Sequence, residues 1–145
     1  MKIGLHTSSF GEITLDNAIS QVSELGYSYI ELAADISNTP HFMAHRATIA
    51  QQISLEKQLE RHSLQLSAID IGGWDIPLCI SNSNEDYRLK AVRDVTKVIH
   101  VANNLGCNLI TSHLWGFDGI HPKYNQQKCI QSLKKSVYEL SPLLG

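Results

Sequence analysis

Histidine and carboxylate side chains close several short apolar runs of this 145-residue sequence. Such groups can bind hydroxyls, exchange protons or hold a metal ion. Two tryptophans follow in the adjoining loops. An aromatic ring beside polar groups suits a sugar, whose C–H faces pack on rings while its hydroxyls need donors and acceptors. The candidate substrate-binding residues are His6, Glu31, Asp70, Trp74, His113 and Trp115.

His113 is the first choice among these candidates, because it follows an apolar strand and precedes an aromatic loop. Its imidazole could bind substrate or a metal ion, or could simply bond to neighbouring backbone. The metal hypothesis is the weaker one, because a catalytic zinc usually needs three protein ligands and only Asp118 and His121 lie nearby in the sequence. The spacing supports no Ser-His-Asp or Cys-His arrangement, so neither a catalytic residue nor a metal ligand is assigned.

Structural roles stay open for the other polar candidates. Glu31 alternates with apolar neighbours and should face the interior, where a carboxylate must be paired or hydrogen-bonded. Glu31 could therefore either position its neighbours or bind substrate, and the same two roles are open for His6. Asp70 ends a run that is apolar on both faces, so the side to which it points is ambiguous, and it could equally satisfy backbone groups in the turn at Gly72 and Gly73.

The remaining histidines and a group of basic residues on the polar side of the third predicted helix are expected to lie at the surface. These residues are His41, His45, His62 and His100, and Arg88, Lys90, Arg93 and Lys97.

The elements that must position the candidates are short β-like runs that alternate with amphipathic helices. Strands are predicted at residues 2–7, 27–32, 64–71 and 108–112. The first helix starts at the N-cap Thr14 and ends at Gly26, the second covers about 46–62, and the third ends at Gly106. The apolar face of the first helix includes Leu25, and that of the fourth includes Val137. The apolar face of the second helix includes Ile49, Ile53 and Leu59.

Strict alternation of strand and helix predicts an α/β fold with a parallel sheet and right-handed crossovers. The first strand is followed by His-Thr-Ser-Ser-Phe-Gly, which lacks the glycine pattern of a dinucleotide-binding sheet, and no P-loop is present. A full (β/α)8 barrel takes about 250 residues. Four units in 145 residues therefore predict a single domain, residues 1–145, with the architecture of half a barrel.

Four segments carry a resemblance to a known family. They are residues 3–10, 26–32, 88–91 and 102–113, and their order and spacing are more specific than any one segment. The pattern resembles the xylose-isomerase-like TIM barrels, which include sugar-phosphate isomerases, ketose 3-epimerases and related apurinic endonucleases. The resemblance covers the whole chain and implies the N-terminal half, (β/α)4, of a TIM (β/α)8 barrel.

The resemblance implies a sugar or sugar-phosphate isomerase or epimerase that needs a divalent metal such as Mn, Co, Mg or Zn. In this family a Glu, an Asp, a His and a Glu at the ends of strands five to eight hold the metal, and the chain stops after its fourth helix. We therefore expect this chain alone to bind no metal and to be inactive, as a truncated product or as one half of a split barrel. A non-catalytic half barrel, which self-associates or pairs with a complementary half, is the alternative.

An endonuclease-like hydrolase is a minor alternative. That branch has a histidine at the end of its third strand, where this chain has Ile71-Gly72-Gly73. A formal net charge of −2 also argues against a nucleic-acid partner. No apolar run is long enough for a membrane span or a signal peptide. Three scattered cysteines indicate neither disulfides nor zinc, so a cytoplasmic location is expected.

Overall fold

The computed structural model describes residues 3–34, 41–72, 78–112 and 126–144. Strands β1 to β4 cover Gly4–His6, Tyr29–Ala33, Gln65–Asp70 and Ile110–Thr111. Helices α1 to α4 cover Leu15–Glu24, Ile49–Arg61, Glu85–Asn104 and Gln126–Leu140. Three short 3-10 helices, η1, η2 and η4, cover Thr7–Phe10, Ala44–Arg46 and Ser141–Leu143.

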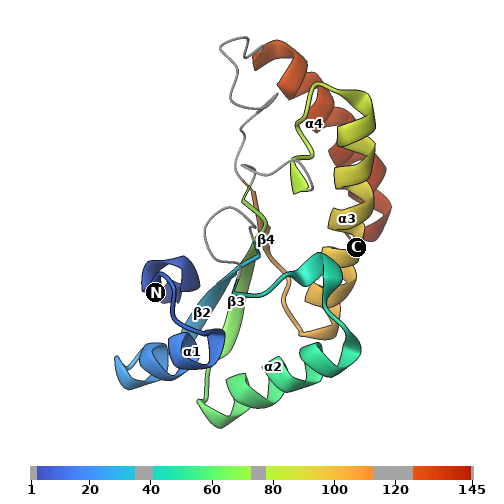
Figure 1. Cartoon of the computed structure of the whole chain (residues 1–145). Coiled ribbons are helices and arrows are strands. Elements are labelled where there is room, and N and C mark those ends of the chain that lie inside the picture. Colours follow the sequence, from blue (N-terminus) through green and yellow to red (C-terminus); the bar gives the residue numbers. More distant parts are fainter. Residues whose placement is uncertain (1–2, 35–40, 73–77, 113–125, 145) are drawn as a thin grey trace.

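The strands form one parallel sheet in the order β1-β2-β3-β4, so every strand pairs only with its neighbours in the sequence. The helices follow one another in an arc around this sheet, and α3 and α4 lie side by side (Figure 1). The predicted α/β fold with parallel strands is therefore confirmed. The strands are shorter than predicted at both ends of the sheet, because Thr7 already begins η1 and β4 pairs only at Ile110 and Thr111.

A β-bulge in β3 decides which side chains share a face of the sheet. Ile30 pairs with Leu66, but Glu31 pairs with Ala68, so Ser67 is an extra residue whose hydroxyl donates to the Ile30 carbonyl at 3.0 Å. The bulge resets the two-residue alternation of the strand. This is why the sequence of β3 reads as apolar on both faces and why the direction of Asp70 was ambiguous.

The face of the sheet opposite to Glu31 and Asp70 forms the core. Ile30, Leu32 and Ile69 are completely buried, together with Ile19 of α1 and Val98 of α3. Burial of such side chains contributes about 1.5–3 kcal/mol each. The helices that cover this face are capped at their ends. The Thr14 hydroxyl accepts the Asn17 amide at the start of α1, as predicted. Gly26 and Gly106, which follow the ends of α1 and α3, have φ values of +82° and +66°.

The predicted apolar face of α2 is wrong at two positions. Ile49 and Ile53 are 63% and 45% exposed, whereas Gln52, Leu55 and Leu59 are buried. Gln52 tolerates burial because its side chain donates to the Ala47 carbonyl at 3.1 Å and accepts from Asn104 at 2.9 Å. Leu25 and Val137, predicted on the apolar faces of α1 and α4, are also exposed.

Among the described residues, no helix is long and apolar enough to cross a membrane. Cys79, Cys107 and Cys129 are buried free thiols, and burial raises the pKa of Cys107.

Candidate functional site

Three of the six predicted site residues meet at the carboxyl end of the sheet. The strand register pairs His6 with Glu31 and Ala33 with Asp70, so His6, Glu31 and Asp70 lie on the same face, away from the core. Active sites of barrels lie at this end of the strands. Trp74, His113 and Trp115 lie outside the described residues.

His6 and Asp70 form a pair across the intervening strand. The Nε2 atom of His6 lies 3.2 Å from Oδ2 of Asp70, and the His6 side chain is 26% exposed whereas that of Asp70 is 11% exposed. The other ring nitrogen, Nδ1, accepts the Ser8 amide at 3.2 Å and also contacts the Ser8 hydroxyl. A nitrogen that accepts a backbone N–H carries no proton. The proton of the neutral ring is therefore on Nε2, which donates it to Asp70.

The second oxygen of Asp70 has the structural role that the sequence left open. Oδ1 accepts the Gly72 amide at 2.9 Å, in the turn that follows β3. Asp70 thus joins the turn after its own strand to the imidazole at the end of β1. The two donors, Nε2 of His6 and the Gly72 amide, hold the carboxylate of Asp70 in place.

Glu31 and Thr111 form a second pair, of which the sequence identified only the first member. The Thr111 hydroxyl on β4 donates to Oε1 of Glu31 on β2 at 2.7 Å, past the intervening strand β3. The register also pairs Thr111 with Asp70, so Thr111 belongs to the same face as the three predicted residues. Its place two residues before His113 was the available signal, since alternation puts Thr111 opposite to Ile110.

Two further hydrogen bonds close the end of the sheet. The Thr7 hydroxyl, fully buried, accepts the Ala33 amide at 2.8 Å. The Ser112 hydroxyl donates to the Gly72 carbonyl at 3.0 Å. Side chains from all four strand ends are therefore hydrogen-bonded across the sheet, and we call His6, Glu31, Asp70 and Thr111 the rim cluster.

The rim cluster presents one imidazole, two carboxyl groups and one hydroxyl, which is a set suited to donors and acceptors on a polyhydroxylated ligand. It does not supply a metal site. Within residues 3–34, 41–72, 78–112 and 126–144, no three His, Cys, Asp or Glu side chains are grouped so that they could hold a metal ion.

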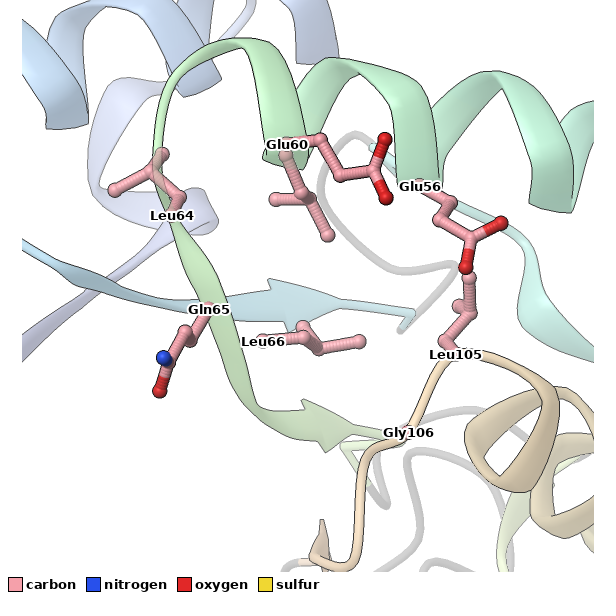
Figure 2. A pocket seen from close by; sticks show the side chains of 8 residues that line it. Glu56, Glu60, Leu64, Gln65, Leu66, Leu105 and Gly106 are labelled. Atoms are coloured by element: carbon pink, nitrogen blue, oxygen red, sulfur yellow. The ribbon is translucent and has the colours of Figure 1, made fainter.

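Two pockets in the described part of the chain lie at the other end of the strands. One has a volume of about 290 Å³ and opens between α2 and the start of β3; its lining includes Glu56, Glu60, Gln65 and Leu105 (Figure 2). A second, of about 500 Å³, includes Gly4 and Tyr29 at the starts of β1 and β2. Both face the amino ends of the strands, where barrels hold no catalytic residues, so we assign the site to the rim cluster.

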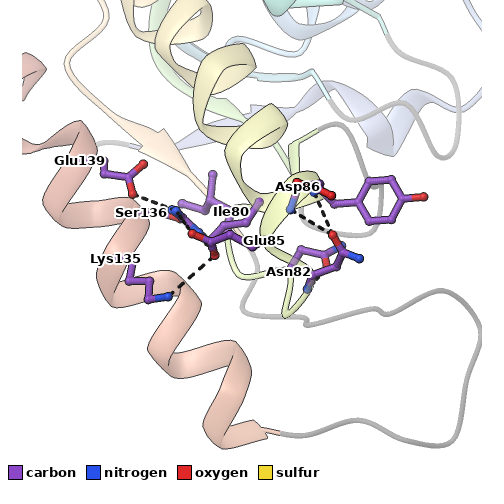
Figure 3. Close-up of polar contacts among 10 residues, drawn as sticks. Ile80, Asn82, Glu85, Asp86, Lys135, Ser136 and Glu139 are labelled. Carbon is purple, nitrogen blue, oxygen red and sulfur yellow. Dashed lines mark hydrogen bonds and ion pairs between the residues drawn. The ribbon is translucent and has the colours of Figure 1, made fainter.

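Arg88 corrects another prediction, because it is 1% exposed and not on a solvated face. Its guanidinium donates two bonds to Glu85, at 2.9 and 2.8 Å, one to Glu139 at 2.8 Å and one to Ser136 at 3.0 Å (Figure 3). The Ser136 hydroxyl in turn donates to the Ile80 carbonyl at 2.7 Å. These hydrogen bonds raise the pKa of Arg88. The network fixes α4 to the start of α3 and to the connection that follows β3.

His45 was also wrongly expected at the surface, since it is 5% exposed, and His41 and His62 are only partly exposed. The segment around it, including η2, packs on α3, which the local sequence pattern does not reveal. By contrast, Lys90, Arg93, Lys97 and His100 are exposed as predicted.

Residues 19–145 match the model of a family described as the xylose isomerase-like TIM barrel. No curated protein sequence matches the chain.

Several solved structures share the fold. A D-psicose 3-epimerase in the presence of D-fructose is 17% identical with a TM-score of 0.79, over 99% of this chain and 48% of that one. D-psicose 3-epimerase with D-tagatose from Clostridium cellulolyticum H10 is 19% identical with a TM-score of 0.77, over 99% and 48%. A 3-keto-D-glucoside 4-epimerase from E. coli is 14% identical with a TM-score of 0.70, over 99% and 51%. The chain thus spans about half the length of these structures and has the fold of half a TIM barrel.

Proposed function

Because the chain belongs to the xylose isomerase-like TIM barrel family, we propose that it is the N-terminal half of a sugar or sugar-phosphate isomerase or epimerase. The observation that carries this proposal is the rim cluster, in which His6 bonds to Asp70 and Thr111 bonds to Glu31 at the carboxyl end of the sheet. Several structures with the same fold are sugar epimerases, which supports the same substrate class.

In this proposal the rim cluster binds and orients the hydroxyl groups of the sugar. The carboxylates of Glu31 and Asp70 accept hydrogen bonds, and the Thr111 hydroxyl can also accept one. His6, with its proton on Nε2, donates to Asp70 and holds that carboxylate in position. His113 would contact a further substrate group, and Trp74 and Trp115 would pack on C–H faces of the sugar.

The proton transfer itself needs groups beyond the rim cluster. Moving a proton next to a carbonyl takes a base and a group that stabilises the developing negative charge, such as a divalent metal. The described residues do not fit a metal ion. We propose that strands five to eight of the complete barrel supply the metal ligands, and that this chain alone is inactive.

Solvent exchange tests the proposal without knowledge of the product. The chain is incubated in D2O with a panel of ketoses, aldoses and their phosphates and with Mn²⁺, Co²⁺ or Mg²⁺, and NMR follows the loss of protons next to the carbonyl. We expect no exchange with the chain alone, and exchange once it is joined to the βα units encoded downstream of it. Exchange well above background by the chain alone would contradict the proposed inactivity. A completed barrel that exchanges no sugar proton would contradict the proposed enzyme class.

A non-catalytic assembly module is the second candidate. Ile3 beside β1 and Leu109 beside β4 are more than half exposed, and these are the two edge strands of the sheet. Exposed strand edges are templates for pairing with another chain. We therefore propose that the chain self-associates or pairs with a complementary half. Light scattering after size exclusion measures this directly, and a monodisperse monomer with a sharp thermal transition at high temperature would argue against it.

A further inference from the structure

The segment of residues 41–48 connects to α2 and is held against its surroundings by an unusual set of contacts. Phe42, Ala44 and His45 are buried, and η2 within the segment packs on α3. At its start, Nε2 of His41 donates to the Ile13 carbonyl at 2.9 Å. At its end, Thr48 forms a capping box with Gln51 that begins α2.

His45 is the anomaly in this segment. His45 is 5% exposed, yet neither Nδ1 nor Nε2 has a hydrogen-bond partner among the described residues, whereas His41 lacks one only at Nδ1. Buried polar atoms in native proteins are nearly always satisfied, so a ring with two unsatisfied nitrogens calls for an explanation. Packing contributes to holding the neutral ring, but no acceptor is in place for the second N–H that protonation would add.

The charges around His45 act on its protonation in both directions. Lys90 and Lys97 of α3 and the adjacent Arg46 are positive, and Asp94 of α3 is the one carboxylate that acts on the ring. Asp94 is already bonded to Lys97, at 2.7 Å between Oδ1 and Nζ. The negative charge that Asp94 presents to His45 is therefore partly offset by Lys97.

We propose that His45 is an acid-sensitive latch, which holds residues 41–48 against α3 while its ring is neutral and releases them when the ring is protonated. In the released segment the imidazolium is hydrated and its two N–H groups bond to water. The latch lies outside the rim cluster, and it gives the connection between β2 and α2 a response to pH that is independent of the proposed catalytic role.

The direction of the effect follows from proton linkage. Burial lowers the pKa of His45, Asp94 opposes this, and Arg46, Lys97 and Lys90 lower it further. The released ring has the ordinary pKa of 6.5, so as the pH falls the released form binds the proton first. Docking is therefore complete above pH 6.5 and is weakened below it, by up to about tenfold in the opening equilibrium for each pH unit.

Hydrogen exchange with mass spectrometry tests this on the 145-residue chain. Uptake is measured at pH 7.5 and 5.5 and corrected for intrinsic exchange. We expect the opening equilibrium of peptides within residues 41–48 to rise about threefold or more at the lower pH, while β3 stays protected. His45→Leu should abolish this rise. His100→Gln, which replaces an exposed histidine on α3, is the matched control and should leave the rise unchanged.

Three outcomes would overturn the proposal. One is an unchanged pH response of residues 41–48 in His45→Leu. Another is opening of these residues together with β3 at both pH values, because that is global unfolding and not release of a segment. If His45→Leu does not fold, NMR titration of the wild-type ring decides: a midpoint below 6.5 supports the latch, and a midpoint at or above 6.5 refutes it.

Discussion

His6 on β1 reaches past β2 to Asp70 on β3, with 3.2 Å between Nε2 and Oδ2. Glu31 repeats this relationship one strand later, since it accepts from Thr111 on β4 past β3. The intervening strands carry Ala33 and Ala68 on the same face, both almost fully buried. Small side chains at these positions leave space for the two crossing hydrogen bonds, so the rim cluster depends on alanines that do no chemistry themselves.

A double-mutant cycle on His6 and Asp70 should reveal their coupling. We expect Asp70→Ala to lower the free energy of unfolding by about 1–3 kcal/mol, because it removes the carboxylate that accepts from the Gly72 amide and from His6. His6→Ala should cost about 1 kcal/mol. Urea unfolding of the single and double variants measures the coupling, which should exceed about 0.5 kcal/mol. Strictly additive effects would mean that the pair contributes nothing as a pair.

Arg88 should be far more important for stability than its neighbours on α3. Arg88→Met removes all four donated bonds and leaves the buried Ser136 hydroxyl with one partner fewer. We expect a loss of about 2–4 kcal/mol in the free energy of unfolding. Arg93→Met, on the exposed side of the same helix, should change it by less than about 0.5 kcal/mol. Equal effects of the two substitutions in urea unfolding would refute the structural role of the network.

The same network predicts a loss of stability in acid. The hydrogen bonds from Arg88 lower the pKa of Glu85 below its ordinary value of 4.5. The folded carboxylate therefore holds no proton at a pH where the unfolded one does, and the stabilisation present above pH 4.5 is lost as the pH falls through the lowered pKa. Urea midpoints between pH 5.5 and 3 should fall more steeply for the wild type than for Arg88→Met. Parallel curves would contradict this. The comparison with Arg88→Met separates this effect from that of His45, because both proteins keep His45.

Substitutions on α2 should follow the observed face and not the predicted one. Leu55→Ala should lower the free energy of unfolding by about 2–5 kcal/mol, because Leu55 is buried in the core. Ile53→Gln should change it by less than about 0.5 kcal/mol, because that side chain is exposed. Thermal melts or urea unfolding of both variants provide the test, and a large cost for Ile53→Gln would place it in an interface with another chain.

Local patterns were sufficient to predict the order of the elements, the Thr14 cap and the glycines after α1 and α3. They also placed His6, Glu31 and Asp70 at strand ends, since alternation and turn residues are local signals. The burial of Arg88 and His45 could not be predicted in this way. The partner Glu139 is 51 residues from Arg88, and His45 is covered by a helix far along the chain. Thr111 was missed because its partner is two strands away.

The bulge at Ser67 marks the limit of the period-two pattern. One inserted residue changes the face of every residue after it. Only the pairing with β2 shows where in β3 the alternation changes. The face to which Asp70 points therefore could not be predicted from the sequence of β3 alone.

The strand order β1-β2-β3-β4 has a consequence for synthesis of the protein. Each of β2, β3 and β4 pairs with the strand made just before it, so its partner is already present when it is translated. Pairing between neighbours in the chain keeps loop-closure entropy low, and domains fold from the N-terminus as they leave the ribosome. The sheet can therefore grow by one βα unit at a time, and β4, paired through only two residues, is the growing end.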